Sequence, residues 1–172
     1  MIHNHKRAVN SKLKHIKTTI YEHCGFKLSN FEAETESKDY EACSYQLNRL
    51  KIICRTAKKT PKKIGQFVTF WKRENNGLIA PFSECDMFDF FVVNIATENE
   101  QGQFVFPKSV LIKKGIISTK YKEGKRAFRV YPIWDHPTSK QAITTQKWQL
   151  SYFFMINSAT DLTKVVDLYA CI

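Results

Sequence analysis

The first regular pattern of apolar residues lies near the start of the chain. Across residues 12–24, apolar side chains recur at intervals of three and four, at Leu13, Ile16, Ile20 and Tyr21. This spacing places them on one face of an amphipathic helix. Residues 37–43 are ambiguous, because helical and alternating patterns overlap there. We favour a short helix over 37–43, followed by a β-hairpin that turns at Asn48-Arg49.

Strand-like patterns dominate the middle of the chain. Residues 66–73 are rich in aromatic and β-branched side chains on both faces, which predicts a central strand. Residues 88–96 form a nearly continuous apolar run that predicts a buried strand, and residues 103–106 predict the strand that returns from its hairpin. Residues 125–131 alternate between two faces and predict another strand, ended by Pro132.

The last long pattern is helical and completes the expected fold. Residues 139–157 contain no Gly, Pro or acidic residue, so we expect one helix packed on the sheet. The sequence therefore predicts an α+β fold with a central, mostly antiparallel β-sheet flanked by N-terminal and C-terminal helices. We expect a single domain over 1–172, with a basic N-terminal helix region at 1–25 and a short C-terminal tail at 158–172.

Apolar runs and cysteine content indicate where in the cell the protein is expected to lie. No apolar run reaches the roughly 20 residues that a membrane-spanning helix needs, and the first residues lack the apolar stretch of a secretory signal peptide. We therefore expect a cytoplasmic protein. Its five cysteines are an odd number without a C-x-x-C pair, which argues against a disulfide framework.

The charge is strongly and unevenly basic. The chain carries 27 Lys and Arg against 16 Asp and Glu, a formal net charge of +11. Residues 49–73 hold nine basic side chains and no acidic one, and residues 108–129 hold eight against Glu123 alone. Such an excess favours a polyanionic partner. We expect nucleic acid, DNA more than RNA, if the two basic blocks share one face of the molecule.

Aromatic residues interleave with these cations, which is typical of proteins that hold single strands. There, bases stack on exposed rings while cations contact the phosphates. We expect Trp71 and Trp134 to be the stacking residues, and interpret Phe67 and Phe70 as core. The candidate nucleic-acid-binding residues are Arg55, Lys58, Lys62, Lys63, Trp71, Lys72, Arg73, Lys108, Arg126, Arg129 and Trp134.

An enzymatic alternative uses Asp86, Asp89 and Lys108. Asp89 enters the buried strand at 88–96, and Lys108 follows the returning strand. This layout resembles the PD-(D/E)xK nucleases and a restriction-endonuclease-like fold, in which carboxylates hold Mg²⁺ beside the scissile phosphate. Asp86 and Asp89 would be the metal ligands, and Mg²⁺ the sole cofactor. Phe106 stands where that pattern has a carboxylate, so a degenerate, non-catalytic site and purely structural roles for both aspartates remain open.

Five segments, in the same order along the chain, resemble the MepB-like family of small bacterial proteins. They are RTAKKTPKKIGQFVTFWKR (55–73), PFSECDMFDFFVV (81–93), GQFVFPKSVLIKKGI (102–116), RVYPIWD (129–135) and TQKWQL (145–150), within about residues 20–157. The resemblance implies a bacterial protein, often encoded beside a multidrug efflux transporter, and it supplies no catalytic residues. A third hypothesis is therefore a module linked to drug efflux that binds an acidic protein or a small anionic ligand.

Overall fold

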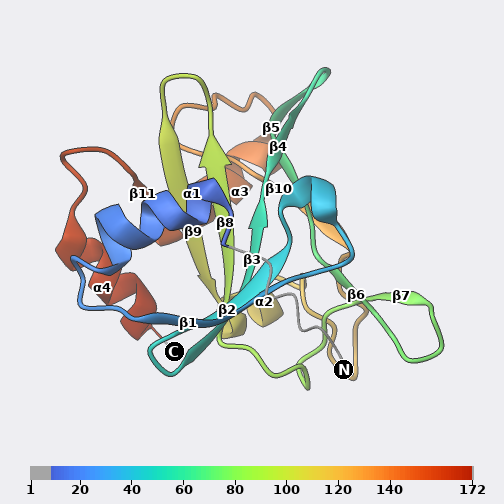
Figure 1. Cartoon of the computed structure of the whole chain (residues 1–172). Coiled ribbons are helices and arrows are strands. Elements are labelled where there is room, and N and C mark those ends of the chain that lie inside the picture. The colour runs from blue at the N-terminus through green and yellow to red at the C-terminus, as the bar shows by residue number, and fades with distance from the viewer. Residues whose placement is uncertain (1–8, 172) are drawn as a thin grey trace, which may run out of the picture.

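A six-stranded sheet forms the centre of the computed structural model, which describes residues 9–171 (Figure 1). Its strand order is β1-β2-β3-β8-β9-β11. β3 and β8 run parallel, and every other neighbouring pair in this sheet is antiparallel. The strands span Leu28–Ala33 (β1), Cys43–Leu47 (β2), Leu50–Thr56 (β3), Phe90–Ala96 (β8), Gln101–Pro107 (β9) and Phe153–Met155 (β11). The predicted α+β class, the mostly antiparallel sheet and the hairpin at Asn48-Arg49 are confirmed.

Two smaller sheets lie beside the main one. The first has the order β10-β5-β4, with β4 at Lys58–Thr60, β5 at Lys63–Thr69 and β10 at Ala127–Val130. The second pairs β6 (Trp71–Arg73) with β7 (Ile79–Pro81). The single strand predicted over 66–73 is wrong, because the chain passes from one sheet to the next at Phe70. The Phe70 ring is fully buried against Phe82 and Phe91. The Phe70 backbone N–H donates to the backbone carbonyl of Arg126, which lies outside both sheets.

Alternating residues of the main sheet supply two hydrophobic cores. Phe90, Val92 and Val105 pack on one face with α1 (Ser11–Ile16), its π-helical continuation η1 (Lys17–Tyr21) and α4 (Leu162–Ala170). Phe91 and Phe106 pack on the other face with α2 (Lys108–Lys113), the 3₁₀ turn η3 (Leu150–Tyr152) and the small three-stranded sheet. α3 (Lys140–Gln149) contributes Trp148 to that second core. The predicted N-terminal helix is therefore confirmed in place.

The C-terminal prediction is wrong in its details. The helix expected over 139–157 ends at Gln149, and the chain turns through η3 into β11. Strand geometry sends Phe153 into one core and Phe154 into the other, whereas a helix at the edge of β9 could not do so. The expected tail contains α4, whose first turn is capped by Asp161 accepting from the Lys164 N–H.

Two further predictions concern residues 37–43 and the N-terminal region. The short helix predicted over 37–43 is a single 3₁₀ turn, η2, at Lys38–Tyr40. The first eight residues of the basic N-terminal region lie outside the described residues. Over residues 9–171, no helix is both long and apolar enough to cross a membrane.

Candidate nucleic-acid interface

A row of basic and aromatic side chains crosses the outer face of the three-stranded sheet. In the register of the strands, Phe67 on β5 is paired with Arg129 on β10 and with Lys58 on β4. Their neighbours Val68 and Val130 are buried in the core. Because successive residues of a strand face opposite sides, Lys58, Phe67 and Arg129 lie together on the side that faces away from the core.

Contacts between rings and cations hold this row in place. The Arg129 guanidinium lies 5.8 Å from the centre of the Phe67 ring. It also donates to Thr60 Oγ1 at 2.8 Å and to the Gly65 carbonyl at 3.0 Å. Tyr40 meets Phe67 edge to face, with 6.2 Å between ring centres. We call Tyr40, Lys58, Phe67 and Arg129 the basic–aromatic row.

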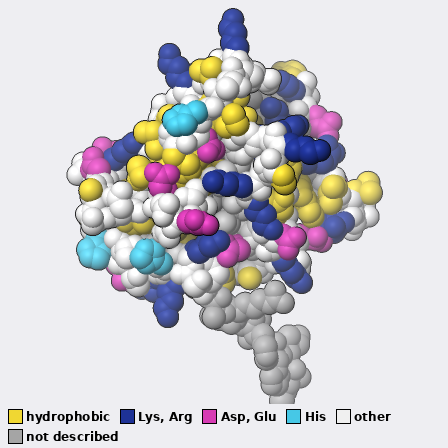
Figure 2. All heavy atoms as spheres, turned by 90° about the horizontal axis from the view of Figure 1, so that it is seen from above, with side chains coloured by type: hydrophobic (Ala, Val, Ile, Leu, Met, Phe, Trp, Pro, Cys, Tyr) yellow, Lys and Arg dark blue, Asp and Glu magenta, His cyan; other side chains and the backbone are white. Residues whose placement is uncertain are grey.

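The hairpin that joins β4 to β5 extends the positive charge beyond this row. Lys59, Lys62 and Lys63 are exposed at the hairpin, and none forms an ion pair with a residue between 9 and 171. The hairpin projects away from the main sheet (Figure 1), and the view from above shows Lys and Arg side chains spread over this face, with Asp and Glu side chains among them (Figure 2). Cations without acidic partners are available to phosphates.

A glycine fixes the base of this hairpin. Gly65 has φ +84°, a backbone conformation that residues other than glycine rarely adopt. A Cβ atom there would lie 2.5 Å from the Tyr131 ring. The tight approach of β5 to Tyr131 leaves the Gly65 carbonyl in reach of Arg129, so the backbone here helps to orient the basic–aromatic row.

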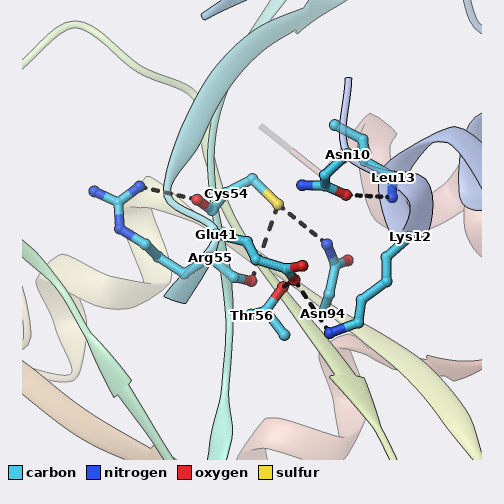
Figure 3. A network of polar contacts seen from close by, with 8 residues as sticks. All are labelled: Asn10, Lys12, Leu13, Glu41, Cys54, Arg55, Thr56 and Asn94. Carbon is cyan, nitrogen blue, oxygen red and sulfur yellow. Dashed lines mark hydrogen bonds and ion pairs between the residues drawn. The ribbon is translucent and has the colours of Figure 1, made fainter. Parts of the chain in front are cut away.

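Arg55 does not belong to this surface. Its side chain is fully buried and forms a bidentate ion pair with Glu34, at 3.0 and 2.6 Å. It also donates to the Cys54 carbonyl, and Figure 3 shows the guanidinium directed away from the thiol of Cys54 and from Asn94. A fully buried guanidinium is out of reach of a phosphate, so the structure removes Arg55 from the predicted contacts.

Three other predicted contacts have acidic partners. Lys72 pairs with Asp86 at 2.7 Å, Arg73 with Glu36 at 2.6 Å, and Arg126 with Glu123 at 2.9 Å. Each pair reduces the positive potential that a phosphate would meet. The basic block at 49–73 is thus divided between the exposed hairpin and a neutralised end near β6.

The two predicted stacking residues are both partly buried. Trp134 packs edge to face on Phe153, 5.7 Å between ring centres, and its indole N–H is buried without a partner. That placement is a correction, because the partly buried ring packs against the second core. Trp71 is half-buried on β6, with the Arg73 guanidinium 5.7 Å from its ring.

Sequence reasoning missed the rings that do lie among free cations. Phe67 was interpreted as core, yet it is only half-buried, and Tyr40 was placed in a helix. The two-residue period of a strand could have identified Phe67 as an outward-facing residue, because its neighbour Val68 faces the core. Nothing in the sequence pattern pointed to Tyr40, which reaches Phe67 from a separate 3₁₀ turn.

Asp86, Asp89 and Lys108 do come together. They line a cavity of about 400 Å³ at one end of β8 and β9, beside Lys51 and Phe88. Each of these three side chains, however, already has a hydrogen-bond partner within the fold. Asp89 Oδ2 accepts from the Lys51 backbone N–H at 2.7 Å, and Lys108 Nζ donates to the backbone carbonyls of Glu84 and Asp86.

The electrostatics of Asp86 fit a structural role. Burial opposes its ionisation, but the Lys72 ammonium and the Ser83 N–H outweigh burial and hold the pKa of the carboxyl below its usual value. Phe106 leaves the third ligand position apolar and fully buried. Among residues 9–171, no group of three or more His, Cys, Asp or Glu side chains could hold a metal ion. The geometry therefore gives no support to the predicted Mg²⁺ site.

Comparison with known proteins assigns the chain to a family. The family model described as MepB-like matches residues 34–155, and the chain belongs to that family. A crystal structure of MepB is 34% identical, with a TM-score of 0.76, and the alignment covers 87% of this chain and 99% of that one. A bacterial homing endonuclease, I-Ssp6803I, aligns at 15% identity and a TM-score of 0.42, over 83% of this chain and 93% of that one. No curated protein matches the sequence.

Proposed function

We propose that this protein binds nucleic acid through the basic–aromatic row and the lysines of the β4–β5 hairpin. The observation that carries the proposal is the register of Lys58, Phe67 and Arg129 across three neighbouring strands. One aromatic ring flanked by two cations on an outward face is suited to a base and its adjacent phosphates. Lys62 and Lys63 extend the same charge beyond the row.

The distribution of acids also supports this placement. Within residues 9–171, ion pairs neutralise Arg55, Lys72, Arg73 and Arg126, whereas Lys62 and Lys63 form no ion pair. A phosphate backbone gains most from cations that it does not share with a carboxylate. The hairpin and the row are therefore favoured over the β6 end of the same basic block.

Fluorescence anisotropy with labelled single-stranded DNA, duplex DNA and RNA across a salt series tests the proposal. Each titration is run with EDTA and with Mg²⁺, and the strand is then checked on a denaturing gel. We expect binding that weakens linearly with the logarithm of salt concentration and an intact strand in both conditions. Absence of binding to all three at low salt would contradict the proposal and direct attention to an acidic protein partner.

A further inference from the structure

A second cavity lies away from the main-sheet end that holds Asp86 and Asp89. Its volume is about 310 Å³, and it is lined by β10, α3 and the segment that follows α2. Small-molecule sites have volumes of roughly 300 to 1,000 Å³. The cavity is therefore larger than an inorganic anion needs and large enough for a small organic molecule.

The charge in this cavity has one sign. Lys114 and Lys125 line it, and none of its lining residues in the described chain is acidic. Neither lysine forms an ion pair with a residue between 9 and 171. Arg129 also borders the cavity, but its guanidinium is committed to Thr60 and Gly65 on β4 and β5. The two lysines thus supply the free positive charge.

An aromatic wall positions one of these lysines. Lys114 Nζ lies 5.1 Å from the centre of the Trp148 ring, a cation–π distance. Trp148 is in turn held by Phe106, with 5.5 Å between ring centres. The Trp148 ring is thus anchored in the core while it lines the cavity, and the ammonium that it attracts stays at the cavity wall.

Polar groups at the start of α3 face the same cavity. Ser139 Oγ accepts from the Ala142 N–H at 3.2 Å, which leaves the hydroxyl proton free to donate. The Gln141 side chain has no hydrogen-bond partner among the described residues and lines the cavity. Gln149 is different, because it is fully buried and satisfied by the Arg129 carbonyl and the Tyr131 N–H. It closes the free edge of β10 and forms a rigid floor.

We infer that this cavity is a binding site for a small phosphorylated molecule of about the size of a nucleoside monophosphate. Lys114 and Lys125 would hold the phosphate by charge-assisted hydrogen bonds. Ser139 and Gln141 would bond the polar body of the ligand. The inference does not depend on the proposed nucleic-acid function, because Lys114 and Lys125 belong neither to the basic–aromatic row nor to the β4–β5 hairpin.

Isothermal titration calorimetry with adenosine monophosphate, adenosine and inorganic phosphate tests the site. The monophosphate is expected to bind more tightly than either fragment, because only it engages both the lysines and the polar wall. Lys114→Gln and Lys125→Gln should each weaken its binding about tenfold, the order expected for loss of one hydrogen bond to a charged group. The control is Lys113→Gln, which removes the same charge from an exposed lysine on α2 that does not line the cavity.

The outcomes separate this inference from the proposed function. Lys62→Ala with Lys63→Ala should leave the affinity for adenosine monophosphate within about twofold, because neither lysine lines the cavity. No binding of the monophosphate by the parent protein would overturn the inference. So would binding of adenosine as tight as that of the monophosphate, or an equal loss in Lys113→Gln. Loss of oligonucleotide binding with monophosphate binding intact would count against the nucleic-acid proposal alone.

Discussion

Arg129 and Phe67 face each other on neighbouring strands, with the guanidinium 5.8 Å from the ring centre on the outward side of the small sheet. The same guanidinium donates to β4 through Thr60 and to β5 through Gly65. One side chain thus joins all three strands and keeps the Phe67 ring beside a positive charge. On this account Arg129 both orders the interface and contributes to it.

The first prediction concerns the ring rather than the charges. Phe67→Leu removes a stacking surface but keeps every cation, so we expect weaker oligonucleotide binding with an unchanged salt dependence. The loss should approach the roughly 1 to 3 kcal/mol that one stacked base contributes. Anisotropy titrations at several salt concentrations measure both quantities, and circular dichroism checks the fold. Unchanged affinity would show that Phe67 only supports its neighbours.

The second prediction concerns the buried ion pair. Glu34→Gln leaves the guanidinium of Arg55 buried without its counter-charge, at a cost of about 2 to 3 kcal/mol in unfolding free energy, which is below the value for a fully buried pair because Glu34 is partly exposed. Urea denaturation measures this cost. Glu36→Gln is the matched control, because it breaks the exposed pair with Arg73 and should change stability little. Equal effects of the two substitutions would contradict the structural role assigned to Arg55.

The third prediction concerns the cavity that holds Asp86, Asp89 and Lys108. Both carboxylates are occupied by internal donors, so Mg²⁺ should leave the Tm of the parent protein unchanged. Asp89→Ala should lower the unfolding free energy by about 1 to 2 kcal/mol, through loss of its bond to the Lys51 N–H. A rise in Tm with Mg²⁺ that disappears in Asp89→Ala would restore the metal-site hypothesis.

The fourth prediction concerns pH. Burial, opposed by Lys59 and His136, raises the pKa of Asp135, and its Oδ2 atom is buried without a donor. A raised pKa in the folded state means that the folded protein binds this proton more tightly than the unfolded chain. Asp135 therefore costs stability above its folded pKa, and that cost is relieved as pH falls below the unfolded pKa.

Comparison with a neutral side chain tests this sign. Asp135→Asn should increase stability relative to the parent at neutral pH, and the difference should shrink as pH falls. Thermal unfolding of both proteins at matched ionic strength across pH 4 to 7 measures the trend. A difference that instead grows toward acidic pH would show that the Asp135 carboxylate is stabilised in the folded state.

The sequence predicted the two hairpins at the centre of the main sheet, β2–β3 and β8–β9, but it did not predict β1 or β11. Residues 88–96 and 103–106 became β8 and β9, whose alternate side chains enter two cores. The helix expected over 139–157 failed at its end, because pairing of Phe153 with Phe104 overrode a helix-compatible pattern. Such pairing depends on residues about fifty positions apart, which no local pattern contains.

The interface was predicted less completely, for a related reason. Basic blocks are visible in sequence, but their acidic partners are not. Glu34 neutralises Arg55 from β1's far end, and Asp86 meets Lys72 across a loop. Lys58, Lys62 and Lys63 are the predicted contacts that lie exposed and form no ion pair with another residue between 9 and 171. Local clustering of charge therefore indicated the class of partner, whereas the contact surface required the fold.

The central claim is that the hairpin lysines contact the phosphates of a nucleic acid. It is tested most directly by the salt dependence of oligonucleotide binding in two double variants. Lys62→Ala with Lys63→Ala removes two cations from the hairpin, and Lys27→Ala with Lys164→Ala removes two exposed cations from the region of β1 and α4. On single-stranded DNA we expect the hairpin variant alone to lose affinity and to reduce the slope of log K against log salt by about 1.4, or about 0.7 per lost phosphate contact. Equal losses in both variants, or an unchanged slope in the hairpin variant, would contradict the claim.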